Sequence, residues 1–336
     1  MRCLRPRTVG FEHDGKTICW SPKRYSKQYA TLQLPCSKCI ECRLEYARQW
    51  AVRCVHEAKM YENNSFITLT YSDENLVSDK LYYADFQNFL KRLRDHSYRK
   101  FLDEFGRENW KLLSKEERKA FYDRFSVGVF VTGEYGDRTK RPHWHACLFN
   151  WSPGDLEYKY TSDRGDRVYS SETLDRLWGK GITELGSVTF ESAGYCARYA
   201  AKKLVHGDDG HRYEPISKKS SRYAIGKKWL ERYWRDVFNY GYVVLDNGTR
   251  VSIPRYYEKW LKKEHPDDWI RYVTETKASW MMEASSEDKL KRLNRDKINW
   301  ERLDHGKGLL ISENKVREIV SNDRFKRLQQ FLKGDI

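Results

Sequence analysis

The stretch Arg141-Pro142-His143-Trp144-His145-Ala146-Cys147-Leu148-Phe149 decides how the fold is interpreted, because it holds two histidines one residue apart. The run from His145 to Phe149 is typical of a β-strand, and Pro142 stands at its start, where a residue without an N–H is tolerated. Residues i and i+2 of a strand face the same side, so both imidazoles would project from one face with Trp144 buried on the other. Such a pair is half of a divalent metal site, and the alternative is two ordinary strand histidines.

The residues before this strand supply a third candidate ligand. Ser126–Thr132 also has a strand pattern, and Gly133–Asp137 follows as a strand end and turn. If the two strands pair as a hairpin, Glu134 lies near the histidines. Two imidazoles and one carboxylate leave positions open for water and a phosphate oxygen, and the hard carboxylate favours Mg²⁺ or Mn²⁺. The alternative is a surface glutamate beside a turn.

The segments around this hairpin alternate between strand and helix patterns. In chain order they are a strand at 66–71, a helix at 81–94, a charged helical insertion at 97–125, a helix at 170–178, a strand at 182–190 and a helix at 193–204 that Ser192 would cap. The order β-α-β-β-α-β predicts an α+β fold, with an antiparallel sheet of about five strands and flanking helices in the split βαβ, ferredoxin-like arrangement.

The composition shifts beyond residue 210. Tyr242–Ile253 has the pattern of a hairpin around Asp246-Asn247-Gly248, and from about residue 255 the chain reads as mostly helical and charged. We therefore expect three parts, which are a basic, cysteine-rich segment at 1–60, the α+β domain at 61–210, and a basic C-terminal region with a helical extension at 211–336.

The overall charge points to a polyanionic partner. The 336 residues include 63 Lys and Arg against 48 Asp and Glu, a formal net charge of +15, and 15% are aromatic. The mean hydropathy of −0.87 and the lack of an apolar run near 20 residues exclude an integral membrane protein. No apolar stretch follows the first charges, so we expect no secretory signal. Positive charge beside many aromatic residues suggests nucleic acid, and the alternative is a protein that is merely basic.

Three of the eight cysteines, Cys36, Cys39 and Cys42, form a cluster. Without a secretory signal we expect reduced thiols, so the clustering indicates a metal more than disulfides. Three thiolates are most of a tetrahedral Zn²⁺ site, and the fourth ligand could be Cys3, Cys19, Cys54 or His56. An iron–sulfur cluster or three thiols without metal are the alternatives. Because residues 1–60 carry 12 Lys and Arg against 5 acids, we expect a zinc-pinned module that holds DNA.

A second basic run lies between residues 216 and 229. It contains five cations and no acid, namely Lys218, Lys219, Arg222, Lys227 and Lys228. With Tyr223 and Trp229 among them, the run fits contacts to the phosphate backbone and stacking on bases of single-stranded DNA. The alternative is a solvated basic loop.

The predicted helix at 193–204 carries Tyr195, Tyr199 and Lys202. Residues i, i+4 and i+7 of a helix share one face, so these three side chains would form one stripe. Taken alone, such a stripe is a core-facing aromatic surface.

Three motifs taken together resemble those of the HUH superfamily of rolling-circle replication initiators, in its two-tyrosine form. They are Phe66-Ile67-Thr68-Leu69-Thr70, Arg141-Pro142-His143-Trp144-His145 and Tyr195-x-x-x-Tyr199-x-x-Lys202, in that order. More narrowly, the stretches 35–43, 133–136 and 221–226 resemble the replication initiators of microviruses, the gokushovirus-type phages with small single-stranded DNA genomes. The resemblance spans roughly residues 35–230.

The resemblance implies a metal-dependent DNA endonuclease whose catalytic domain is 61–210. His143, His145 and Glu134 would hold Mg²⁺ or Mn²⁺ at the scissile phosphate. One tyrosine would nick the origin of the replicative form, keep the 5′ phosphate and leave a 3′-OH, and the other would later help to close the displaced strand into a circle. Lys202 would favour the charged phosphate or phenolate. Host helicase and polymerase would be partners in the host cell cytoplasm. The alternatives are a zinc-containing DNA-binding regulator without activity, or another HUH enzyme such as a relaxase or transposase.

Overall fold

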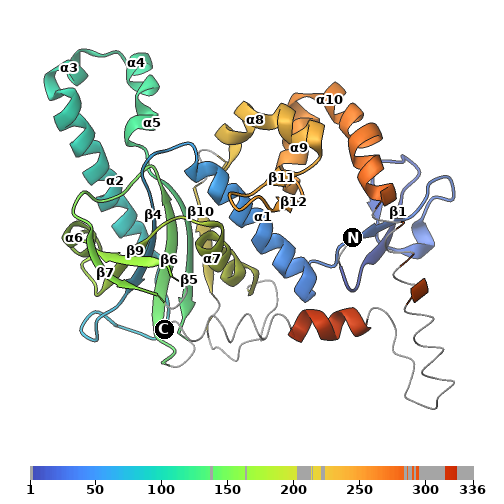
Figure 1. Ribbon diagram of the computed structural model, residues 1–336, viewed down its shortest axis with the longest axis horizontal. Coiled ribbons are helices and arrows are strands. Elements are labelled where there is room, and N and C mark those ends of the chain that lie inside the picture. The colour runs from blue at the N-terminus through green and yellow to red at the C-terminus, as the bar shows by residue number, and fades with distance from the viewer. Residues whose placement is uncertain are drawn as a thin grey trace. The chain divides into compact units, whose positions relative to one another are not determined.

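The computed structural model describes residues 3–136, 139–162, 165–202, 215–220, 224–283 and 315–323, with single positions at 213, 286, 290, 293 and 294 (Figure 1). The side chains of residues 199–202 are not among those described. The chain divides into two compact units, one drawn from Met1–Tyr46 and Ala278–Gly334 and the other from Ala47–Lys277. The three segments expected from composition stay a prediction, because these units are defined by contacts.

The second unit is built around a seven-stranded sheet in the order β10-β5-β6-β4-β9-β8-β7. Every neighbouring pair is antiparallel, which confirms the predicted α+β fold. The strands are β4 (Asn64–Thr70), β5 (Gly128–Tyr135), β6 (Pro142–Phe149), β7 (Glu157–Thr161), β8 (Arg167–Ser170), β9 (Thr183–Gly186) and β10 (Ile216–Lys219). The hairpin of β7 and β8 and the edge strand β10 extend the expected sheet of about five strands.

One face of this sheet carries the main hydrophobic core. Ile67, Leu69 and Trp144 are completely buried there, as period-2 alternation predicts for a half-covered sheet. The helices α2 (Tyr83–Phe105) and α6 (Glu172–Trp178) contribute their apolar sides to the same core. Trp144 is therefore buried behind the two histidines, as the sequence predicts.

The opposite face carries polar residues and is covered by two other helices. The helix α7 (Phe190–Lys202) lies against β5 and β6 (Figure 1). The helix α1 (Ile40–Ala58) brings Trp50 onto this face, where its ring stacks on Phe130 of β5 with centroids 5.2 Å apart. Glu134, two residues after Thr132 and four after Phe130, shares this side of β5.

The helix α7 begins at Phe190 rather than at residue 193, and the strand before it ends at Gly186 rather than at 190. The reason is a reciprocal cap in which Ser192 N–H donates to Thr189 Oγ1 at 3.1 Å and Thr189 N–H donates to Ser192 Oγ at 2.8 Å. Thr189 therefore takes the capping place predicted for Ser192, and the helix gains a turn at its start.

The segment 97–125 is helical, as predicted. It comprises the end of α2, then α3 (Arg107–Leu112), α4 (Lys115–Ala120) and α5 (Tyr122–Phe125). A cluster of rings holds these helices together, formed by Tyr98, Phe101, Phe105, Trp110, Phe121 and Phe125.

The second unit ends in a smaller helical layer with its own core around Leu230, Trp234 and Tyr257. Its elements are α8 (Lys227–Tyr240), β11 (Val243–Val244), β12 (Arg250–Val251), α9 (Arg255–Glu264), α10 (Pro266–Arg271) and a π-helical turn, η2 (Tyr272–Lys277). The strands β11 and β12 pair as the hairpin predicted around residues 246–248, with Gly248 at a positive φ of 77°.

The first unit holds a small sheet in the order β2-β1-β3, which the sequence did not predict. Its elements are β1 (Arg7–Phe11), β2 (Ile18–Cys19), η1 (Pro22–Arg24) and β3 (Leu32–Leu34), and a helical stretch at 315–323 belongs to the same unit. Among the described residues, no helix combines the length and the apolar character that crossing a membrane requires.

Candidate metal centre and nucleophile

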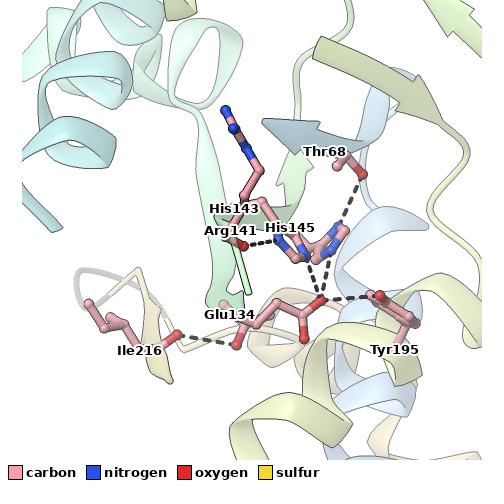
Figure 2. Close-up of polar contacts among 8 residues, drawn as sticks. Thr68, Glu134, Arg141, His143, His145, Tyr195 and Ile216 are labelled. Carbon is pink, nitrogen blue, oxygen red and sulfur yellow. Dashed lines mark hydrogen bonds and ion pairs between the residues drawn. The ribbon is translucent and has the colours of Figure 1, made fainter. Parts of the chain in front are cut away.

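The register of the β5–β6 hairpin places the predicted ligands together. Glu134 pairs directly with His143, so both side chains leave the same face. The Oε1 atom of Glu134 lies 3.1 Å from His143 Nε2 and 2.9 Å from His145 Nε2 (Figure 2). The three ligand atoms lie within 4.8 Å of one another, close enough to surround one small cation.

Each imidazole is oriented through its other nitrogen. His143 Nδ1 lies 3.1 Å from the backbone oxygen of Arg141, and His145 Nδ1 lies 3.0 Å from Thr68 Oγ1 (Figure 2). A backbone carbonyl can only accept, so Nδ1 of His143 carries its hydrogen and Nε2 of the neutral ring is a lone pair aimed at Glu134. Outer partners of this kind hold metal-binding histidines in one tautomer.

The carboxylate of Glu134 is nearly completely buried, with 2% of the residue exposed. Burial alone would raise its pKa, but hydrogen bonding to His143 and His145 outweighs burial and lowers the pKa of Glu134 to about 2. Burial also lowers the pKa of His145, which favours its neutral form. The result is a buried anion facing the basic nitrogens of two imidazoles.

This donor set fits a hard divalent cation. The Oε2 atom of Glu134 is buried and has no hydrogen-bond partner within the described part of the chain. A neutral His143 would turn a lone pair toward a carboxylate that only accepts, and this contact needs either a proton or a cation between the two atoms. Glu134, His143 and His145 would hold that cation, and one carboxylate with two imidazoles suits Mg²⁺ or Mn²⁺ as predicted.

Tyr195 reaches this centre from α7. Its hydroxyl donates to Oε1 of Glu134 at 3.1 Å (Figure 2). Its ring meets the His145 ring edge-on, with centroids 4.8 Å apart, while Phe66 stacks on the other side of His145 at 5.9 Å. The Arg198 guanidinium lies 5.9 Å from the centre of the Tyr195 ring. One predicted nucleophile thus lies within hydrogen-bond distance of the predicted metal ligands.

The other two members of the predicted stripe are only partly placed. The helix α7 extends through Tyr199 and Lys202, but the side chains of both lie outside the described residues.

The predicted DNA-binding lysines fall into two groups. Lys218 and Lys219 lie on β10, which pairs with β5, and Lys219 extends over the Trp50 ring at 4.2 Å. Lys227 and Lys228 begin α8 and form ion pairs with Glu231 at 3.2 Å and Asp123 at 2.7 Å. Arg222 lies outside the described residues. Acids distant in sequence therefore offset the second pair, although the run itself contains none.

The predicted thiol cluster gains a fourth member. Cys3, Cys36, Cys39 and Cys42 gather in the first unit, and all eight cysteines of the chain are free. Cys19 instead donates its S–H to the backbone oxygen of Ser21 at 3.4 Å.

Sequence reasoning missed the groups that orient the ligands. Thr68 lies within the first motif but gave no chemical signal, because its pairing with His145 depends on the register of β4 against β6. The backbone oxygen of Arg141 and the ring of Phe66 give no side-chain signal at all.

Comparisons with known proteins agree with this arrangement. A sequence model of the family described as replication-associated protein ORF2 matches residues 64–204. The chain is 43% identical over 334 residues to replication-associated protein VP4 of Bdellovibrio phage phiMH2K, which covers 99% of this chain and 100% of that protein. It is 31% identical over 294 residues to replication-associated protein ORF2 of Spiroplasma virus 4, with 82% and 85% covered.

A third relative, replication-associated protein ORF4 of Chlamydia phage 1, is 32% identical over 250 residues, which cover 72% of this chain and 56% of that protein. No solved structure matches the chain.

Proposed function

Because the chain belongs to the replication-associated proteins of the microviruses, we propose that it initiates rolling-circle replication by nicking one DNA strand at the phage origin. The observation that carries this proposal is the convergence of a tyrosine hydroxyl and two imidazoles on one buried carboxylate. Such a group suits the transfer of a phosphoryl group to tyrosine. It is consistent with the HUH resemblance of the sequence.

Glu134, His143 and His145 would hold Mg²⁺ or Mn²⁺, which when bound polarises the scissile phosphate and offsets charge on its oxygens. The sheet fixes these three ligands through strand pairing, so they need little reorganisation when DNA arrives.

Tyr195 is the described nucleophile. Its oxygen forms the bond to phosphorus, the P–O3′ bond breaks, and the phenolic proton passes to the 3′ oxygen directly or through water. Glu134 is a poor base for this proton, because its pKa is about 2 and an ordinary tyrosine has a pKa near 10. The 3.1 Å hydrogen bond therefore orients the hydroxyl rather than removing its proton.

Tyr199 and Lys202 complete the proposal. The phosphotyrosine bond conserves the energy of the phosphodiester, so the strand can be rejoined without ATP. Tyr199 would cleave the regenerated origin after one round, and the freed 3′-OH would attack the first link to close a circle. Lys202 would favour phosphate or phenolate in either step.

DNA is the proposed partner of the basic surface on β10. Lys218 and Lys219 lie on the strand next to β5, which carries Glu134. Their charges can guide a phosphate backbone to the centre. The 3′-OH would be extended by a host polymerase with a host helicase, in the cytoplasm of the host cell.

The test is a covalent protein–DNA adduct. The full chain with Mn²⁺ is incubated with single-stranded oligonucleotides that tile the viral strand of its genome, and adducts are resolved on denaturing gels. We expect Tyr195→Phe with Tyr199→Phe to abolish the adduct while DNA binding by fluorescence anisotropy persists. Tyr240→Phe, at an exposed tyrosine on α8, is the matched control. An adduct in the double variant contradicts the nucleophile assignment, and binding without any adduct in the wild type favours a non-enzymatic regulator.

A further inference from the structure

We propose that Cys3, Cys36, Cys39 and Cys42 bind one Zn²⁺ in a tetrahedral site of four thiolates. The site lies in the first unit, is separate in sequence from the proposed metal centre on the sheet, and has a structural role beyond nicking. The sequence left four candidates open for the fourth ligand. The geometry selects Cys3, which lies 33 positions before Cys36 in the chain.

The distances between the sulfurs match a tetrahedron around zinc. Cys36 Sγ lies 4.0 Å from Cys42 Sγ, and Cys39 Sγ lies 3.9 Å from Cys3 Sγ. Zn–S bonds of about 2.3 Å in a tetrahedron separate the sulfurs by about 3.8 Å. A disulfide needs about 2.05 Å, so these are not bonded pairs. The two distances are opposite edges of one tetrahedron, and all four sulfurs lie within 4.8 Å of one another.

The backbone around the cluster is shaped to donate to sulfur. The N–H of Cys36 donates to Cys3 Sγ at 3.2 Å, and the N–H of Cys39 donates to Cys36 Sγ at 3.3 Å. Ser37 takes a left-handed backbone with φ of 62°, a conformation that residues other than glycine seldom adopt. This turn directs the amide groups at sulfur. Amide donors stabilise negative thiolates, which are the form that binds zinc.

The surroundings also suit a negatively charged centre. Four thiolates around Zn²⁺ carry a net charge of −2. Residues 1–46 contain nine Lys and Arg against four acids, so the unit supplies compensating positive charge. Carboxylates and imidazoles are absent from the four-member cluster, and an all-sulfur set selects zinc over the hard cations.

The small unit needs such a link. The strands of its sheet have only five, two and three residues, and its buried apolar residues before position 46 are few, namely Leu4, Val9, Cys19 and Ile40. Domains of this size rarely fold on a core alone and use disulfides or metals instead. A zinc bound to residues 3 and 36–42 would close the chain around the whole sheet.

The zinc would also fix the start of α1. The helix begins at Ile40, between the ligands Cys39 and Cys42, and is continuous to Ala58. Its later turns carry Trp50, which stacks on Phe130 of the main sheet. The same helix thus begins in the thiol cluster and ends in the core that supports the sheet.

Metal analysis of the full chain tests the proposal. We expect one zinc per purified wild-type chain, measured by plasma mass spectrometry, and loss of that zinc in Cys3→Ser, Cys36→Ser, Cys39→Ser and Cys42→Ser. Cys19→Ser is the matched control, because this buried thiol of the same unit is outside the cluster. Iron with acid-labile sulfide, or no metal in the wild type, overturns the proposal. Zinc retained in Cys3→Ser alone overturns Cys3 as the fourth ligand.

Wild-type protein supplies a second measurement in case the variants fold poorly. We expect cobalt substitution to give the intense charge-transfer and d–d absorption of tetrahedral Co²⁺ with four thiolates, and a chelator to open tryptic sites at Lys16, Lys23, Arg24 and Lys27. Octahedral cobalt spectra, or the same cleavage with and without zinc, contradict the site. Neither readout depends on nicking, so a failed adduct assay leaves this test intact.

Discussion

Gly133→Ala tests whether the close contact between β5 and Trp144 holds the metal ligands in place. Gly133 pairs directly with Trp144 across the β5–β6 hairpin. A Cβ at this position would lie 2.5 Å from Cζ3 and 2.7 Å from Cε3 of the indole, closer than real Cβ atoms approach. Trp144 is completely buried and packs on Phe86, so the indole cannot turn into solvent.

The expected cost follows from this overlap. Overpacking a filled core costs about 1–3 kcal/mol. For a unit of this size, a loss of about 2 kcal/mol lowers the melting temperature by about 4–8 °C. Because Trp144 stands between His143 and His145 on β6, the displaced indole also moves both ligands, and Mn²⁺ should bind more weakly.

Scanning calorimetry measures the first effect and isothermal titration with Mn²⁺ the second. Gly154→Ala is the matched control, since a Cβ there meets no atom within 4 Å. In a Trp144→Phe background the smaller ring leaves room, so the two substitutions should cost less together than the sum of their separate costs. A Gly133→Ala protein that melts with the wild type, or two costs that simply add, would refute the steric reasoning.

Three further outcomes follow from the described contacts. Thr68→Val should weaken Mn²⁺ binding about 10- to 100-fold because it removes the hydroxyl 3.0 Å from His145 Nδ1, while Thr68→Ser keeps it; equal calorimetric affinities would contradict this role. Burial lowers the pKa of His56 to about 3. The unfolded chain takes up a proton there below about pH 6.5, so folded stability falls with pH from that point, by about 3 kcal/mol at pH 4.5. Urea unfolding of His56→Gln should lose this part of the profile, and an unchanged profile would count against it. Lys219→Ala should reduce the salt slope of single-stranded DNA binding by about 0.7, whereas Lys227→Ala, whose ammonium is ion-paired, should not; equal slopes in filter binding would reject the distinction.

The sequence predicted the centre well because its key residues lie on one hairpin. Period-2 alternation determines which side chains share a face, so Glu134, His143 and His145 could be grouped before any contact was known. The orienting contacts could not be predicted in this way. Thr68 reaches His145 only through the register of β4 against β6, and a register between distant strands depends on packing rather than on local pattern.

Short elements and distant partners were the other sources of error. The strands β1, β2 and β3 are too short to show alternation, and the predicted helix start at 193 missed the cap formed by Thr189. Cys3 could not be chosen over Cys19 from spacing, because the sheet between residues 3 and 36 determines which thiol returns to the cluster.

The division of the centre between sheet and helix limits how two tyrosines can act. The hydroxyl of Tyr195 already contacts Glu134, and its position on α7 is fixed by the cap at Thr189 and Ser192. Position 199 lies one turn further along the helix axis, about 6 Å away at 1.5 Å per residue. The ligands on β5 and β6 are held by strand pairing and cannot follow that distance. Alternating attack therefore requires either an axial shift of α7 or movement of the scissile phosphate along it. Since the cap ties down the first turn of the helix, movement of the DNA is the less costly route.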